Sequence, residues 1–435
     1  MKSKGFYLIV VCVVLLIVPV SVCSQTFSDE QLIEAFKQNP YRASAGHTPY
    51  EAPINNVYTP APKGYKAVYI SHYGRHGSRY QSGEEIYKVV CSSLDEILAN
   101  NLLTASGDSL RRELYILWDA HKNHMGGMLT KVGALEHRSI AERMCMRNPE
   151  VFNQKDRSVV SCRSTVVTRC VESMGNFVMM VKAHNPRLEI VTNTDLLTGR
   201  TEGAPSPHEV WAYSRPAQHA ILEKEKAIKT FAARLFVDPS KAEAYVPEQK
   251  FGEFLVEMFE AAAGAGCLDI DVEPLRFYTP EELLAFNKVR NIHFTSSYGC
   301  FGPTRDISMR HAYPYALLLV EEADEALRGN SHCADLRFAH DKQVGNILSL
   351  LDLENYNVYT PVDQSHNYHP AWKCLSMAVN LQMIFYVNKK SDVLVKFLCN
   401  EVETRIPSLE AVDGFYYRWS DVRSHIYKRI GINEK

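Results

Sequence analysis

Residues 67–79, with the sequence AVYISHYGRHGSR, are the stretch on which the fold assignment rests. The first four of these residues form a short apolar run, which is typical of a buried strand. Arg75, His76, Gly77 and Arg79 follow close behind this run. A glycine beside a reactive side chain lets the backbone and a ligand approach closely. The pattern therefore predicts a buried strand that ends in a functional site.

The histidine of this stretch stands between two arginines. Guanidinium groups disfavour a charged imidazole beside them, so His76 is an odd choice for a structural role. Its position makes sense if a phosphate dianion binds there, because the planar fork of arginine matches phosphate oxygens in pairs. The alternative is an exposed basic turn, which an isolated Arg-His-Gly tripeptide would favour. The longer pattern from Arg75 to Arg79, directly after an apolar strand, favours the anion site.

Strands and helices alternate along the rest of the chain, which indicates an α/β sheet. Residues 195–295 are more polar and have helical patches at 215–236 and 251–263, so we interpret them as an inserted helical cap. The α/β domain then comprises residues 25–194 and 296–435. We expect strands at 67–70, 158–161, 188–191, 335–339, 383–387 and 393–398. We expect helices at 84–103, 109–124, 132–146 (with Thr130 as N-cap), 169–182, 307–327 and 343–351.

The arginine–histidine stretch resembles the signature of the histidine phosphatase superfamily, in the branch that contains acid phosphatases, phytases and multiple inositol polyphosphate phosphatases. Three further motifs resemble those of this family and follow in the family's order. They are Leu129-Thr-Lys-Val-Gly133, Arg163-Ser-Thr-Val-Val-Thr-Arg169 and Leu336-Arg-Phe-Ala-His-Asp341. Four motifs in the right order make the resemblance specific.

The resemblance implies a phosphoglycerate-mutase-like fold, in which helices flank a central, mostly parallel sheet. It also implies that His76 is a nucleophile that becomes phosphorylated and that Asp341 is the proton donor. Binding of the phosphate oxygens falls to Arg75, Arg79, Arg169 and His340. No metal and no cofactor are expected, because the guanidinium groups supply the charge. If the arginines keep His76 neutral and bound phosphate keeps Asp341 protonated, activity should peak between roughly pH 4 and 6.5.

Two departures from the family pattern bear on the substrate. The family often has proline two residues after the second arginine, where this chain has Gln81. The inositol polyphosphate branch commonly has His-Ala-Glu in its second motif, where this chain has His340-Asp341-Lys342. In contrast, residues 71–74 and 395–401 resemble that branch. The favoured function is a phosphomonoester hydrolase for inositol polyphosphates such as phytate. A broad acid phosphatase or sugar phosphatase is the alternative, and a non-catalytic phosphoester-binding protein is a third reading.

The amino-terminal segment has the pattern of a secretory signal peptide. Lys2 and Lys4 precede an apolar run at residues 6–20, and polar residues follow it. We expect a signal peptide at residues 1–24 and export, either to a periplasm or by secretion, with lipid attachment at Cys23 as the alternative. Export permits disulfides, and the mature chain would keep an odd number of cysteines, nine, so at least one would stay free or pair between chains.

Composition limits the partners. The net charge of −2 gives no global positive field for nucleic acid, so the expected partner is a small phosphomonoester. We expect no transmembrane span in the mature chain, and the sequence leaves the oligomeric state open.

Other candidate residues have simpler interpretations. We expect a structural or secondary role for His72 and a helix-start or rim position for His311. Surface or loop positions are expected for His332, His366 and His369. An anion cleft could also draw on Lys131, Arg200 and Lys224, although charged helix faces are usually only solvated.

Overall fold

The structure is a computed structural model of the chain, and it describes residues 26–122, 126–195, 207–246, 250–297, 304–357 and 359–432. The expected signal peptide, Cys23 and Arg200 lie outside these ranges. None of the helices within them combines the length and the apolar character that a membrane span requires.

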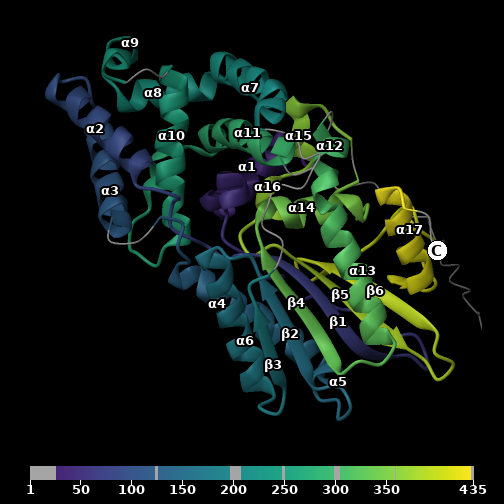
Figure 1. Cartoon of the computed structure of the whole chain (residues 1–435). Helices are drawn as coiled ribbons and strands as arrows, with labels where there is room; N and C mark the ends of the chain where they lie inside the picture. The colour runs from purple at the N-terminus through teal and green to yellow at the C-terminus, as the bar shows by residue number, and fades with distance from the viewer. Residues whose placement is uncertain are drawn as a thin grey trace, which may run out of the picture.

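A mixed eight-stranded sheet forms the centre of the fold (Figure 1). Its strands lie in the order β3-β2-β4-β1-β5-β6-β7, and β8 also pairs with β6. The first four strands in this order run parallel, whereas β5 and the strands beyond it join by antiparallel pairing. The bounds are β1 Lys66–Arg75, β2 Val159–Ser164, β3 Glu189–Asn193, β4 His332–Ala339, β5 Asn380–Val387, β6 Val393–Cys399, β7 Val402–Thr404 and β8 Tyr416–Arg418. The expected α/β architecture is confirmed.

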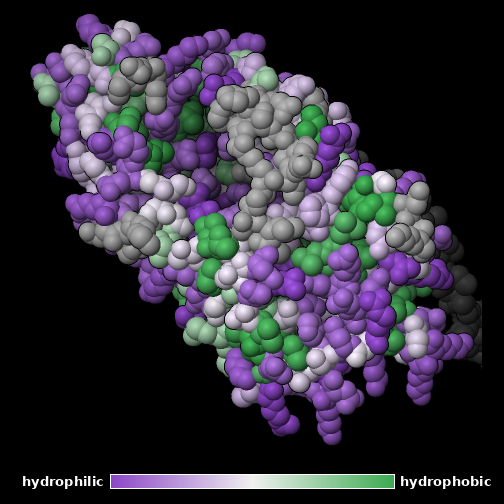
Figure 2. Space-filling view, viewed as in Figure 1, coloured by the Kyte–Doolittle hydropathy of each residue, from purple (hydrophilic) through white to green (hydrophobic). Residues whose placement is uncertain are grey.

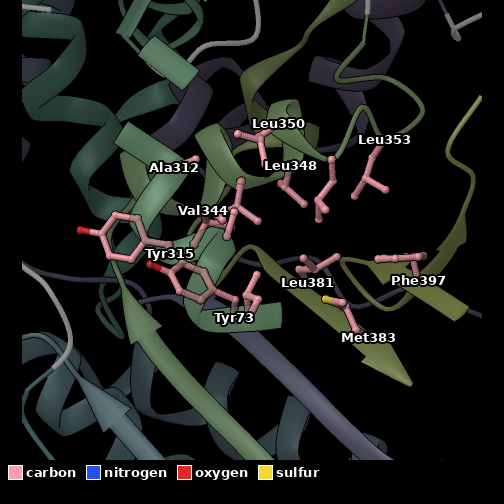
Figure 3. Packing of buried hydrophobic residues seen from close by; sticks show 14 of the residues in the cluster. Tyr73, Ala312, Tyr315, Val344, Leu348, Leu350, Leu353, Leu381, Met383 and Phe397 are labelled. Atoms are coloured by element: carbon pink, nitrogen blue, oxygen red, sulfur yellow. The ribbon is translucent and has the colours of Figure 1, made fainter. Parts of the chain in front are cut away.

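Helices cover both faces of the sheet, as buried parallel strands require. One face packs against α4 (Lys131–Arg147), α5 (Pro149–Phe152) and α6 (Thr168–His184). The other packs against α13 (Tyr313–Leu327), α14 (Asp341–Leu350) and α17 (Trp419–Ile430). Figure 3 shows this second core, in which Tyr73 of β1 and Leu381 of β5 gather with Val344 and Leu348 of α14.

The single helix expected at 307–327 is wrong. The chain instead forms α12 (Arg305–Met309), a 3-10 turn at Arg310–Ala312 and then α13. Pro314 stands in the first turn of α13. A proline is tolerated there, but it has no N–H to continue a helix from the turn before it. The expected helix start at His311 is confirmed, because His311 lies in the 3-10 turn just before α13.

A second part of the molecule is helical and has its own core (Figure 1). Leu94 and Leu114, which precede the expected insertion at 195–295, are buried in one core with Phe231 and Phe259 from within it. The described residues within 195–295 therefore supply only part of the helical layer. The main helices here are α1 (Asp29–Gln38), α2 (Glu85–Ala99), α3 (Ala105–Lys122), α7 (Pro207–Lys224), α8 (Lys226–Leu235), α10 (Phe251–Ala263) and α11 (Pro280–Ser297).

The described ranges contain eight cysteines, and none of these eight forms a disulfide. Seven of them are buried, where a thiol packs like a small apolar side chain. In this part of the chain, packing rather than cross-linking holds the fold.

A buried carboxylate ties the edge of the sheet to α4. Glu401 lies between β6 and β7 with no exposed surface. Its carboxylate pairs with Arg143 at 2.6 Å and with Arg147 at 3.0 Å. The hydroxyl of Tyr50 donates a third hydrogen bond to it at 2.9 Å. Removal of this carboxylate would leave two guanidinium groups without their counter-charge.

We predict that Glu401→Ala lowers the free energy of unfolding by about 2–4 kcal/mol, because it leaves the guanidinium groups of Arg143 and Arg147 without their counter-charge. Chemical denaturation monitored by circular dichroism measures the loss. Glu410→Ala, at an exposed position, is the matched control and should change the free energy by less than about 0.5 kcal/mol. Equal stability of the two variants would contradict the assignment.

Candidate active site

The ends of three parallel strands bring the expected site residues together. Arg75 ends β1 and pairs with Ala339, which ends β4. The N–H of His76 donates to the Ala339 carbonyl at 2.9 Å, and the N–H of Thr165, just past β2, donates to the Phe338 carbonyl at 3.1 Å. Residues that follow adjacent parallel strands share one edge of the sheet, where ligands of α/β proteins bind. Figure 2 shows the surface hollowed between the helical part and the sheet part, with hydrophilic residues in the hollow.

His76 is held in one orientation. Its Nδ1 lies 2.9 Å from the Gly77 carbonyl oxygen. Because a carbonyl only accepts, this contact selects the tautomer that is protonated at Nδ1 and leaves Nε2 with a free lone pair. Burial and then the charges of Arg75, Arg169 and Arg79 hold the pKa of His76 well below its usual range. The buried ring is therefore neutral and can act as a nucleophile at Nε2.

Three guanidinium groups surround this ring. Arg75 is fully buried, and its Nη1 donates to the carbonyls of Gly46 at 2.5 Å and Leu375 at 2.7 Å. The buried Nε atoms of Arg79 and Arg169 have no hydrogen-bond partner within the described part of the chain. Burial, followed by the charges of the other two arginines, lowers the pKa of Arg79. Cations that crowd together with unpaired donors form a site that an anion would complete.

His340 and Asp341 stand at the start of α14 and face the same centre. The His340 ring lies 5.5 Å from the His76 ring, and its Nδ1 lies 3.3 Å from Nη2 of Arg169. Burial and the charge of Arg169 lower the pKa of His340 to about 4. Asp341 pairs with Nη2 of Arg75 at 2.8 Å. Burial opposes ionisation of Asp341, but Arg75 and His340 outweigh it and lower the pKa of this carboxyl.

Close backbone contact explains the glycines of two motifs. A Cβ atom on Gly77 would lie 2.5 Å from the Gly133 carbonyl oxygen, and one on Gly133 would lie 2.2 Å from the Ser78 carbonyl oxygen. Thr130 caps α4 as expected, since its hydroxyl accepts from the Gly133 N–H at 3.2 Å. The same hydroxyl donates to the Ser78 carbonyl at 3.0 Å. The start of α4 is therefore built against the loop that follows β1.

Sequence reasoning missed three residues that support this loop. The Ser173 hydroxyl accepts from the Gly77 N–H at 3.2 Å, and Glu136 accepts from the Ser78 N–H at 2.7 Å. His47, from the 3-10 segment Pro40–His47, places Nε2 3.5 Å from Nη2 of Arg79. Only Glu136 had a signal in the sequence, because it lies three residues after Gly133 and so on the same helix face. The other two reach the site only through tertiary folding.

The remaining candidates lie outside this centre. His72 is buried between Phe177 and Phe338, with ring centroids at 5.0 and 5.4 Å, which fits a structural role. His332 begins β4 and contacts Asp335. The expectation of a surface or loop position is wrong for His366, which is buried within the short helix Ser365–Tyr368. His369 is also buried, but it lies in the loop after that helix, as one of the two alternatives expected.

Lys131 does not join the three guanidinium groups, although it links the two parts of the molecule. It lies at the start of α4 and pairs with Asp269 of the helical part at 2.5 Å, and both side chains are largely exposed. Lys224 is an exposed residue at the end of α7.

A separate cavity is lined by other residues. It has a volume of about 560 Å³, and its walls include Arg42, Tyr356, Trp372 and Cys399. None of the expected catalytic residues lines it. The convergence of His76 with unpaired guanidinium donors therefore makes the strand ends, and not this cavity, the candidate centre.

Solved structures share this fold over most of the chain. Two structures of the multiple inositol polyphosphate phosphatase from Bifidobacterium longum, one in complex with inositol hexasulfate and one with phosphate, are 17% identical to this chain. Their TM-scores are 0.72 and 0.75. The two alignments cover 88% and 89% of this chain, and 97% and 98% of the respective solved chains. A phytase from D. castellii is 15% identical, with a TM-score of 0.65, and covers 92% of this chain and 89% of its own. No family sequence model and no curated protein matches.

This likeness defines the class of fold. The chain has the same α/β fold with a helical part as these structures of an inositol polyphosphate phosphatase and a phytase. The similarity to the inositol polyphosphate phosphatase of Bifidobacterium longum extends over 88% of this chain. The resemblance that the four motifs predicted is confirmed at the level of fold.

Buried neutral histidines predict how stability responds to pH. Burial lowers the pKa of His72 from 6.5 to about 3. Since the unfolded chain then binds a proton that the folded state excludes, stability is lost as the pH falls below about 6.5. We predict that His72→Leu shrinks the loss of unfolding free energy between pH 7 and pH 4.5 by about 2 kcal/mol. Denaturant titrations at both pH values measure it, and an unchanged difference would contradict the prediction.

Proposed function

We propose that the protein is a phosphomonoester hydrolase that works through a phosphohistidine at His76. The observation that carries this proposal is a neutral imidazole with a free Nε2, enclosed by guanidinium groups that keep unpaired N–H donors. A bound phosphate would give those donors their partners. The fold shared with phytases and an inositol polyphosphate phosphatase supports the same chemistry.

In the first step, the lone pair of His76 Nε2 attacks phosphorus while the bond to the leaving oxygen breaks. Equatorial oxygens of the phosphoryl group bind to Arg75, Arg79 and Arg169, whose positive charge matches that of the transition state, and to His340, which supplies a ring N–H donor. The leaving alkoxide takes a proton from Asp341. In the second step, the Asp341 carboxylate takes a proton from water as the water oxygen attacks phosphorus, which releases phosphate and restores His76.

Asp341 must hold a proton before it can donate one. In the ligand-free site its pair with Arg75 lowers its pKa, so the carboxyl is ionised. A bound phosphate dianion competes for Arg75 and adds negative charge beside the carboxylate, and both effects raise its pKa. Substrate binding therefore prepares the acid, and the charge that supports catalysis comes from side chains without a metal or a cofactor.

Inositol polyphosphates such as phytate are the proposed substrates. The structure that this chain resembles over 88% of its length is a multiple inositol polyphosphate phosphatase, observed with inositol hexasulfate. A broad acid phosphatase is the alternative. We further propose that residues 1–24 direct export of the enzyme, on the basis of their signal-peptide pattern.

A panel of phosphoesters tests this function. We expect purified protein to release phosphate from phytate faster than from simple aryl or sugar phosphates, and equally well with a chelator present. Samples quenched during turnover of ³²P-labelled ester should contain labelled phosphate on His76, and His76→Ala should abolish both the label and turnover. Absence of label in an active wild-type enzyme would contradict the mechanism, and faster turnover of aryl phosphates would favour the acid phosphatase.

The leaving group tests Asp341. We predict that Asp341→Asn lowers the rate of phosphoryl transfer from alkyl phosphates to His76 by at least about 100-fold, because general acid catalysis typically contributes about 10²–10⁴-fold. On 4-nitrophenyl phosphate the loss should be much smaller, since nitrophenolate leaves without a proton. Single-turnover kinetics measure phosphoryl transfer directly. Equal losses on both substrates would remove Asp341 from the acid role.

A further inference from the structure

One peptide group connects the nucleophile to a buried carboxylate. The carbonyl of Gly77 contacts His76 Nδ1 at 2.9 Å. The N–H of the same peptide group, on Ser78, donates to Glu136 Oε2 at 2.7 Å. No peptide bond in the described part of the chain is cis. In a planar trans peptide the C=O and N–H point in opposite directions, so the two hydrogen bonds lie on opposite sides of one rigid unit.

The carboxylate is fixed on its own side. Glu136 lies on α4, is only 8% exposed, and accepts from three donors. Besides the Ser78 N–H, these are the Ser78 hydroxyl at 2.8 Å and the Tyr50 N–H at 2.8 Å. The contact between Gly77 and Gly133, one helical turn before Glu136, holds α4 and the loop at this distance. Burial raises the pKa of Glu136, whereas its three donors oppose this shift and stabilise the anionic form.

A carboxylate that accepts from a peptide N–H changes the other end of that peptide. Hydrogen bonds in a chain polarise one another, so the Gly77 oxygen becomes a stronger acceptor. A stronger acceptor holds the Nδ1 proton more firmly and increases the electron density at Nε2. It also fixes the ring plane and the tautomer that nucleophilic attack requires.

We propose that Glu136 is a positioning residue that orients His76 and activates it through the Gly77–Ser78 peptide group. This inference rests on the proposed function of the site. It extends that function, because it adds to the nucleophile a carboxylate that touches neither the ring nor the substrate.

Glu136→Gln tests the proposal, because it keeps the shape and removes the charge. We expect phosphoenzyme formation from 4-nitrophenyl phosphate, measured by rapid quench at pH 6, to slow by about 10- to 100-fold, in the range that loss of an orienting partner behind a catalytic group typically costs. The inhibition constant of inorganic phosphate should change less than threefold, because this ligand binds the arginines and does not need an activated Nε2. Thermal unfolding of the variant checks that it is folded.

Two controls separate activation from simple support of the loop. Ser173→Ala removes the acceptor of the adjacent Gly77 N–H, which belongs to a different peptide group, so it should slow phosphoenzyme formation far less. Glu142→Gln removes one charge from an exposed position of the same helix and should resemble wild type.

Three outcomes would overturn the inference. They are an unchanged rate in Glu136→Gln, an equal loss in Ser173→Ala, and a parallel weakening of phosphate binding that shows a displaced loop. A wild-type enzyme that hydrolyses no phosphomonoester would instead remove the proposed function, and the inference with it. If Glu136→Gln does not fold, Glu136→Asp replaces it, because it keeps the charge but shortens the reach; a normal rate there, with normal phosphate binding, would also overturn the inference.

Discussion

The contact between two backbones, that of the loop after β1 and that of the first turn of α4, is the constraint on which the rest of the site depends. Gly77 and Gly133 leave no room for a side chain between these segments. Their approach brings the Thr130 hydroxyl to the Ser78 carbonyl and Glu136 to the Ser78 N–H. Once α4 is packed, the loop therefore has almost no conformational freedom. This rigidity fixes the orientation of the His76 ring.

The excess positive charge of the site is explained if an anion binds there. Three arginines lie around a neutral imidazole, and Asp341 is the carboxylate that pairs directly with one of them. Gathering cations in a buried site costs free energy, which other parts of the fold must offset. The backbone amides of His76, Gly77 and Ser78 are all engaged by protein groups. The proposed anion would therefore have no access to these three N–H groups and would bind to side chains, in contrast to phosphate loops that cradle their ligand with main-chain N–H groups.

The sequence predicted which segments form the central strands, because a buried apolar run followed by a charged motif has few other interpretations. It ended two of them too early, at residues 70 and 161, whereas β1 runs to Arg75 and β2 to Ser164. Even so, it placed Arg75, Arg169 and Asp341 near one another, and the structure brings them together. It could not predict that Arg75 would be fixed by the carbonyls of Gly46 and Leu375, since every residue has a carbonyl and nothing marks these two. The packing partners of α2 and α3 were equally unpredictable, because an apolar stripe shows that one face of a helix is buried but not which element covers it.

The order of the strands affects how the protein is made. β1 carries the nucleophile motif and lies at the middle of the sheet, between β4 and β5. It is synthesised early, yet both of its neighbours emerge only after residue 331. A growing chain must therefore keep an apolar segment unpaired through most of translation, which exposes it to aggregation and slows folding. If residues 1–24 direct export, as proposed, the same delay is useful, because the central sheet cannot close until β5 and β6 have been synthesised.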